Sequence, residues 1–207
     1  MRILVVGATG TIGRAVVEAL APRHEIVAAS RTKAGISVDL ASNDSIRAMY
    51  QSAGTVDAVV CAAGAARFKP LVELADDDFQ FSLMNKLMGQ VNVVRLGFEH
   101  VRDAGSFTVT SGVLARTPML GSGAISLVNA GLEGFVRAAA LEAPRGLRVN
   151  VVSPPWVTET LKAFGMDESQ GRPAMEVAQL YVRSVEGREN GAVLEIPAKR
   201  RRPATSR

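Results

Sequence analysis

The sequence is poor in cysteine and aromatic residues, with one cysteine, one tryptophan, two tyrosines and seven phenylalanines among 207 residues. A lone cysteine cannot form a disulfide within the chain, which excludes a disulfide-stapled scaffold. We interpret Cys61 as a small buried hydrophobe and His24 and His100 as structural residues, and we expect no metal site.

A long apolar run is also absent from the start of the chain. In the opening MRILVVGATG, four apolar residues are followed by glycine. This run is too short for the core of a signal peptide or for a membrane span. We therefore expect a soluble, cytoplasmic protein with no membrane partner.

Acidic residues are absent from residues 199–207, which hold five of the 24 lysines and arginines. The other 19 cations face 20 acids, so the remainder of the chain has a net charge of −1. The basic excess therefore belongs to this tail, and we expect no nucleic-acid partner for the folded body. Because the tail has no apolar anchor, we expect it to be disordered or held only by a partner.

What the sequence does contain is a regular alternation of short β-branched runs with longer segments of helical period. With 207 residues and 47% hydrophobic content, the chain can bury one substantial core, so we expect a single domain over residues 1–198. The pattern predicts an α/β, Rossmann-type fold, a doubly wound parallel sheet of about seven strands in three α/β/α layers. Strands are expected at 3–6, 25–29, 37–38, 58–61, 106–110, 148–152 and 192–196, and helices at 12–20, 45–52, 78–100, 124–141 and 174–185.

The first motif with chemical meaning is VVGATGTIGRAVVEAL, in which an apolar run leads through Gly7, Gly10 and Gly13 into an amphipathic helix. Glycines let the backbone approach a pyrophosphate closely, and the helix N-terminus supplies unpaired N–H groups and a positive dipole. The context of strand, turn and helix favours dinucleotide binding over a simple tight turn.

The choice of dinucleotide depends on the end of the second predicted strand, where the residues are Ser30, Arg31 and Thr32. An acid at this position would bind the ribose 2′-OH of NAD, whereas an arginine can form a fork of hydrogen bonds to the 2′-phosphate of NADP. We therefore expect NADP(H) to be preferred over NAD(H). A solvated arginine at a strand end is the alternative.

Six motifs follow one another along the chain: GATGTIG at 7–13, SRT at 30–32, VDL at 38–40, CAAG at 61–64, VTSG at 109–112 and RVNVVSPPW at 148–156. In the order of these motifs the chain resembles the short-chain dehydrogenase/reductase family up to Ile196. The resemblance implies that Asp39 contacts the adenine, that Ser111 orients a substrate carbonyl and that Asn85 supports a proton relay. The residues expected to bind the cofactor are Gly7, Thr9, Gly10, Thr11, Ile12, Gly13, Ser30, Arg31, Thr32, Asp39, Leu40, Ala62, Ala63, Gly64, Asn129, Pro154 and Val157.

The stretch GSGAISLVNAGLEGF departs from the family at its catalytic pair. VNAGLEGF is similar to the family's SKAGLEGF, so Asn129 stands at the lysine and Ile125 at the tyrosine, four residues earlier. In the family the tyrosine gives a proton to the carbonyl oxygen, and the lysine lowers the tyrosine pKa. Ile125 has no proton to give, and the uncharged Asn129 can only hydrogen-bond. The chain thus resembles a small subgroup that keeps the cofactor glycines and lacks this pair.

Two functions remain open. The first is an NADP(H)-dependent oxidoreductase acting on a small carbonyl or alcohol, with Ser111 and a water, or the substrate itself, supplying the proton. The second is a nucleotide-binding or regulatory protein that holds NADP(H) without turnover. Lys86 follows Asn85 directly, so on a regular helix it points about 100° away, and we expect it to be a surface charge.

Two further features concern the substrate and the oligomeric state. The stretch WVTETLKAFGMDESQGRP is expected to form a short lid or a packing helix, with an apolar inner face of Trp156, Leu161, Phe164 and Met166 over a small or open pocket. The predicted helices around residues 81–98 and 124–141 are more apolar than one sheet face requires. Family members commonly pair these helices, so we expect a homodimer.

Overall fold

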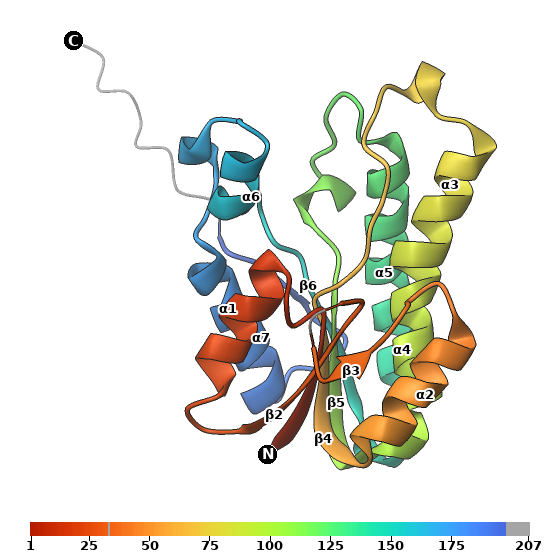
Figure 1. Ribbon diagram of the computed structural model, residues 1–207, viewed down its shortest axis with the longest axis vertical. Helices are drawn as coiled ribbons and strands as arrows, with labels where there is room; N and C mark the ends of the chain where they lie inside the picture. Colours follow the sequence, from red (N-terminus) through yellow and green to blue (C-terminus); the bar gives the residue numbers. More distant parts are fainter. Residues whose placement is uncertain (33, 198–207) are drawn as a thin grey trace.

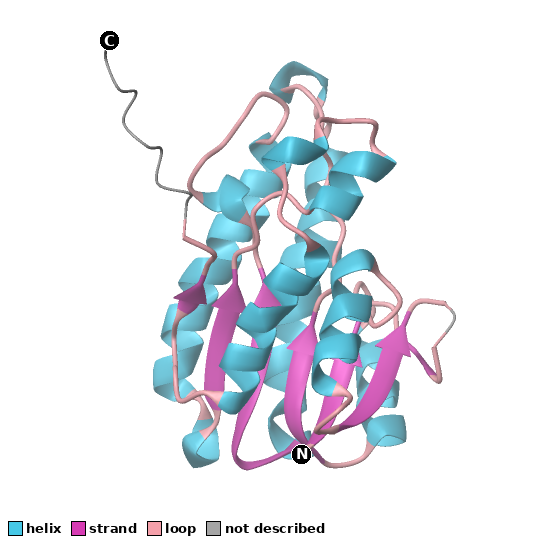
Figure 2. Cartoon of the chain, turned by 90° about the vertical axis from the view of Figure 1, so that its left-hand side faces the viewer, coloured by secondary structure: helices cyan, strands magenta, loops and turns pink. Residues whose placement is uncertain are grey.

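The computed structural model describes residues 1–32 and 34–197. Its centre is one sheet of seven parallel strands in the order β3-β2-β1-β4-β5-β6-β7. The strand arrows point to the same edge of the sheet (Figure 2). The strands are β1 Arg2–Val6, β2 Glu25–Ser30, β3 Ile36–Ser37, β4 Val56–Cys61, β5 Val101–Thr110, β6 Arg148–Val152 and β7 Val193–Leu194. The prediction of a doubly wound parallel sheet is confirmed.

Helices cover both faces of the sheet (Figure 1), because β-branched runs such as Ile3–Val6 are buried on both sides. α1 (Thr11–Leu20), α6 (Thr158–Ala163) and α7 (Ala174–Glu186) lie on one side. The other side carries α2 (Asn43–Ala53), α3 (Asp76–Ser82), α4 (Gly89–Gly97) and α5 (Gly123–Glu142). The order reverses between β1 and β4, and such a switch point places a ligand crevice at the carboxyl ends of the strands.

The prediction of a single helix over residues 78–100 is wrong, because the segment is divided into several elements. α3 and α4 are joined by a π-helical turn, Leu83–Met88, and α4 ends in a 3-10 turn, Phe98–His100. A π-helical turn holds an extra residue, so the side chains that follow its start no longer lie where a regular helix would direct them.

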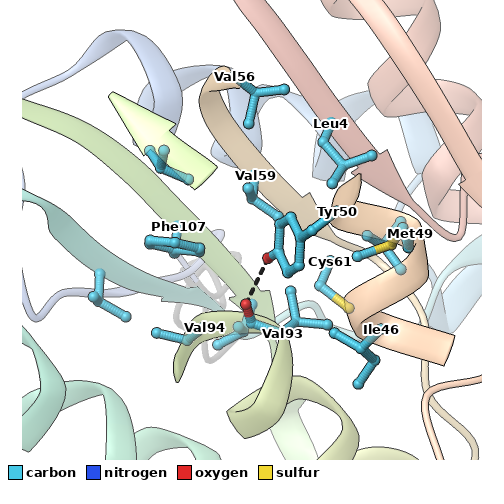
Figure 3. Close-up of a cluster of buried hydrophobic side chains, with 14 of the residues drawn as sticks. Leu4, Ile46, Met49, Tyr50, Val56, Val59, Cys61, Val93, Val94 and Phe107 are labelled. Atoms are coloured by element: carbon cyan, nitrogen blue, oxygen red, sulfur yellow. Dashed lines mark hydrogen bonds between the residues drawn. The ribbon is translucent and has the colours of Figure 1, made fainter. Parts of the chain in front are cut away.

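Both tyrosines of the chain are core residues. Tyr50 on α2 is fully buried among apolar side chains, and its hydroxyl donates to the carbonyl oxygen of Val93 at 2.5 Å (Figure 3). Tyr181 on α7 is equally buried on the opposite face of the sheet, with its hydroxyl 2.7 Å from Oγ1 of Thr110. Burial raises the pKa of both hydroxyls.

The residues interpreted as structural lie where that interpretation places them. Cys61 is fully buried at the end of β4. His24 forms a 2.9 Å contact with Glu186, and the His100 ring stacks on the Tyr50 ring with centroids 4.9 Å apart. The predicted tail, residues 199–207, lies outside the described residues.

Among the described residues one helix, α5, is long and apolar enough to cross a membrane by length and composition alone. Its inner face is buried in the core through Val128, Leu132 and Val136. The core helix of a soluble fold passes the same test, so this feature does not define a membrane segment.

Candidate active site

The turn between β1 and α1 is built by backbone rather than by side chains. Gly7 has φ +86°, and a Cβ there would lie 2.8 Å from the carbonyl oxygen of Ala62. A Cβ on Gly13 would lie 1.9 Å from the carbonyl oxygen of Gly7, so glycine is required for the helix to pack on the turn. The first turn of α1 has no side-chain cap, which leaves its N–H groups available to an anion.

This turn forms one wall of a first pocket of about 300 Å³ at the carboxyl ends of the strands. Twelve of the predicted site residues line it: Gly7, Thr9, Gly10, Ser30, Arg31, Thr32, Asp39, Leu40, Ala62, Ala63, Gly64 and Asn85. Arg31 is exposed, and Ser30 Oγ donates to the carbonyl oxygen of Thr32, which fixes this loop beside Thr9. The first pocket therefore presents a charged donor and a polar loop at the end of β2.

A second pocket of about 220 Å³ adjoins the first and shares Ala62, Ala63 and Gly64 with it. Six other predicted site residues line this second pocket: Ile12, Ser111, Ile125, Asn129, Pro154 and Val157. Thr11 and Gly13 line neither pocket, because Thr11 starts α1 and Gly13 is buried beneath the turn. The structure thus brings together all but two of the predicted residues, although it separates Asn85 in the first pocket from Ser111 in the second.

Ser111 has a buried partner that the sequence does not reveal. Its Oγ donates at 3.2 Å to Oε1 of Glu133, a carboxylate that is 3% exposed on α5. Arg116 and Arg137 each place a guanidinium nitrogen 3.6 Å from Oε2 of Glu133, and these two cations compensate the buried charge. Val152 offers Ser111 a second acceptor, its carbonyl oxygen at 3.5 Å. Both partners only accept, so Ser111 is the donor in either hydrogen bond.

Ile125 and Asn129 lie one helical turn apart at the start of α5, and both line the second pocket, as the family spacing implies. Asn129 is 1% exposed, and within residues 1–32 and 34–197 its Oδ1 has no hydrogen-bond partner. An unpaired buried acceptor is costly unless a bound group satisfies it. Asn129 therefore has one acceptor available for a hydroxyl-bearing ligand.

The prediction for Lys86 is wrong: it lines the second pocket and is not a surface charge. The π-helical turn Leu83–Met88 changes the direction of its side chain, whose stem packs against Gly64. Its Nζ donates to the carbonyl oxygen of Ser111 at 3.3 Å. Burial lowers the pKa of Lys86 to about 8. Asn85, by contrast, donates its amide to the carbonyl oxygen of Phe81 in the preceding turn.

The expected lid is only partly correct. Trp156 lines the second pocket and makes an edge contact with Phe68, with centroids 6.3 Å apart, and Leu161 is buried. Phe164 is 68% and Met166 43% exposed, because α6 ends at Ala163 and the chain then turns outward. The apolar inner face is therefore smaller than expected.

These features define a class of protein: a Rossmann-type dinucleotide-binding fold in which the second, smaller pocket adjoins the first. Residues 7–194 match a family model described as enoyl-(acyl carrier protein) reductase. The chain belongs to the short-chain dehydrogenase/reductase family, whose members use a nicotinamide cofactor.

The chain is similar to solved structures and to curated proteins. The protein lin1944 from Listeria innocua superposes with a TM-score of 0.92 at 37% identity, covering 95% of this chain and all of that one. A small-chain dehydrogenase in complex with NADPH superposes with a TM-score of 0.84 at 23% identity, covering 95% and 96%. Hydroxynaphthalene reductase arp2 of Aspergillus fumigatus is 28% identical over 165 residues, which are 74% of this chain. The chain spans 60% of the length of that reductase.

Proposed function

We propose that this chain is an NADP(H)-dependent oxidoreductase that interconverts a small carbonyl compound and its alcohol in the second pocket. The observation that carries the proposal is the junction of the two pockets at Ala62, Ala63 and Gly64. A dinucleotide in the first pocket would reach the second at this junction, with its nicotinamide beside Ser111 and Asn129. When bound, the nicotinamide exchanges a hydride with the substrate carbon.

The residues present fit such a cofactor. The close approach of Gly7 to Ala62 makes a cradle that a Cβ would fill, as pyrophosphate binding requires. The unpaired Oδ1 of Asn129 can accept a hydrogen bond from a ribose hydroxyl, although Asn129 lacks the charge of the family's lysine. Pro154 and Val157 also line the second pocket.

The preference for NADP(H) over NAD(H) rests on the exposed guanidinium of Arg31 and on the hydroxyls of Ser30 and Thr32. The first pocket holds Asp39 but has no acid at the end of β2, where it would repel a 2′-phosphate. The related small-chain dehydrogenase was crystallised with NADPH, which agrees with this assignment.

A second candidate is an NADP(H)-binding regulatory protein without turnover, a reading that treats the active site as degenerate. Ile125 at the family's tyrosine position favours it, since neither tyrosine of the chain lines a pocket. Fluorescence titration with NADPH and NADH, followed by NADPH oxidation assays over a panel of ketones, quinones and enones, separates the candidates. Turnover of any carbonyl supports the oxidoreductase, and tight NADPH binding without turnover supports the regulatory protein.

We also propose a cytoplasmic homodimer paired through α4 and α5. Leu127 and Leu141 on α5 are 50% and 89% exposed, so the outer face of this helix offers apolar surface to a second copy. Light scattering is expected to give twice the 21.9 kDa of one chain. A clean monomer mass would contradict the dimer.

A further inference from the structure

We propose that Lys86 is the general acid of the second pocket, its ammonium giving the proton that the substrate oxygen takes up when the carbonyl is reduced. This inference rests on the proposed oxidoreductase function and names the group that replaces the family's tyrosine. It assigns chemistry to a side chain that regular helix geometry directs to the surface.

The other residues that line the second pocket are poor proton donors. Ile125 carries no acidic proton, and the amide of Asn129 does not ionise in the physiological range. The single hydroxyl proton of Ser111 is engaged by Glu133 or by the carbonyl oxygen of Val152, so Ser111 offers the pocket only lone pairs. Thr110 and Thr160 also line this pocket, but an aliphatic hydroxyl is a weak acid.

Lys86, in contrast, is held in position with donors to spare. The π-helical turn Leu83–Met88 directs its side chain inward, where the aliphatic stem packs against Gly64. A Cβ on Gly64 would lie only 3.2 Å from Cγ of Lys86. One N–H of the ammonium is used on the carbonyl oxygen of Ser111 at 3.3 Å. An ammonium has three donors, so two N–H bonds remain for a substrate oxygen.

The charges around Lys86 allow it to release a proton near neutral pH. It forms no ion pair with a carboxylate within residues 1–32 and 34–197. From β4 it faces the thiol of Cys61, whose pKa burial raises to about 12, so this thiol is neutral at physiological pH. From α5 the acid is Glu133, whose charge is engaged by Ser111, Arg116 and Arg137. Burial, the dominant cause, lowers the pKa of Lys86 to about 8, close to the optimum for a general acid.

The substrate carbon gains a C–H bond with the hydride that NADPH supplies, and the electron pair of the C=O π bond moves to oxygen. The Nζ–H bond of Lys86 breaks, its proton bonds to that oxygen, and nitrogen keeps the electron pair. The products are the alcohol, NADP⁺ and a neutral amine, which takes a proton from water. Oxidation of the alcohol reverses each change, with the neutral amine as base.

The kinetic test compares wild type with Lys86→Met and Lys86→Arg, using Lys162→Met on the exposed part of α6 as the matched control. Loss of a positioned general acid is expected to lower kcat for carbonyl reduction about 10²–10⁴-fold. Lys86→Arg keeps the charge but holds its proton too tightly, so it should fall nearly as far. Wild-type kcat should decline as pH rises through about 8, because the acid form is then lost, and the residual activity of Lys86→Met should lack this decline.

Two measurements do not depend on turnover. Fluorescence titration should give NADPH dissociation constants within about threefold of wild type for Lys86→Met, because a general acid acts on the substrate rather than on the cofactor. Competitive acetylation of the cofactor-free protein, read by mass spectrometry, should show the Lys86 amine becoming reactive as pH rises through about 8, with the exposed Lys162 as the internal reference.

Each contrary result overturns a different part of the proposal. If wild type reduces a carbonyl and Lys86→Met keeps kcat within about threefold, Lys86 is not the acid and the oxidoreductase function stands. Activity of Lys86→Arg equal to wild type would show electrostatic stabilisation in place of proton transfer. A tenfold loss of NADPH affinity with an unchanged pH profile would make Lys86 a ribose ligand. If wild type binds NADPH but reduces no carbonyl, the proposed function fails and this inference fails with it.

Discussion

The two pockets meet at three residues but are made from different kinds of atoms. The first pocket is formed largely by glycine turns and strand ends, where Gly7 and Gly10 expose backbone. The second pocket is lined by the side chains of Lys86, Ser111 and Asn129, which come from the π-helical turn, the end of β5 and α5 respectively. Recognition by backbone depends on the course of the chain, whereas a reaction depends on which side chain stands at one position.

This difference explains how a chain can keep a fold for binding and change its chemistry. Ile125 lines the second pocket, whereas Val128 and Leu132 on the same helix are buried in the core, so a change of side chain at residue 125 would leave the buried face of α5 in place. Under the proposed function, isoleucine at this position removes the phenolic proton that the family places there. The second pocket can therefore change its chemistry through a single side chain, whereas the shape of the first pocket depends on its backbone and Arg31 adds a charged contact to it.

The largest expected effect comes from restoring the family pair in the second pocket. In a Lys86→Met background, Ile125→Tyr with Asn129→Lys should raise kcat for ketone reduction about 10²–10⁴-fold, because the lysine cation lowers the pKa of the new phenol. Either change alone should gain little, since a lone phenol keeps a pKa near 10 and a lone lysine leaves the substrate oxygen without this donor. Steady-state assays with NADPH over the ketone panel measure the gain.

The matched control for this restoration is Ile125→Phe with Asn129→Lys, which differs from the test variant by one hydroxyl. Equal activity of the two double variants would mean that the phenol is not the proton donor. A single side chain would then not decide the chemistry of the second pocket.

The sequence predicts most of the fold because parallel strands buried on both faces read as uninterrupted apolar runs. All seven strands occur, and β6 has the predicted bounds. β5 begins at Val101, five residues before the predicted start at residue 106. The prediction misses its first half because that half carries Arg102 and Asp103 and includes Ala104 at φ +59°. A polar, bulged strand start gives no apolar signal.

The first pocket is predicted more completely than the second for a related physical reason. Glycine spacing reports the shape of the turn at Gly7 and Gly10, and the order of the family motifs indicates most of the other lining residues. Lys86 is missed because its inward direction depends on the π-helical turn Leu83–Met88, which residue periodicity does not reveal. Glu133 is missed because its partners, Ser111 and Arg116, lie far from it in sequence. Only the folded chain shows that this acid is buried and compensated.

The next effect concerns the first pocket. Arg31→Ala should weaken NADPH binding roughly ten- to over a hundredfold, since a charge-assisted hydrogen bond contributes about 1.5–3 kcal/mol. NADH binding should change little, because it has no 2′-phosphate. Fluorescence titration of both cofactors measures the effect, and Arg47→Ala, an exposed arginine on α2 outside both pockets, is the matched control. Equal affinity of wild type for NADPH and NADH would refute the assignment of Arg31.

The smallest expected effect is on stability. It tests whether the buried ammonium of Lys86 in the second pocket lowers the free energy of unfolding. The folded protein keeps the proton of Lys86 only up to about pH 8, whereas the ordinary pKa of 10.5 applies to the unfolded chain. Between these pH values the unfolded state binds more protons, so wild-type stability from this group rises with pH. Below pH 8 the full penalty is present.

Lys86→Met should therefore raise the free energy of unfolding at pH 7 by about 1–2 kcal/mol after allowance for partial exposure and for the lost bond to Ser111. The difference from wild type should shrink as pH rises from 8 to 10.5, and urea unfolding followed by circular dichroism at several pH values measures it. Lys162→Met, the matched control, should leave the pH dependence of stability as in wild type. A Lys86→Met protein less stable than wild type at pH 7 would mean that Lys86 stabilises the fold.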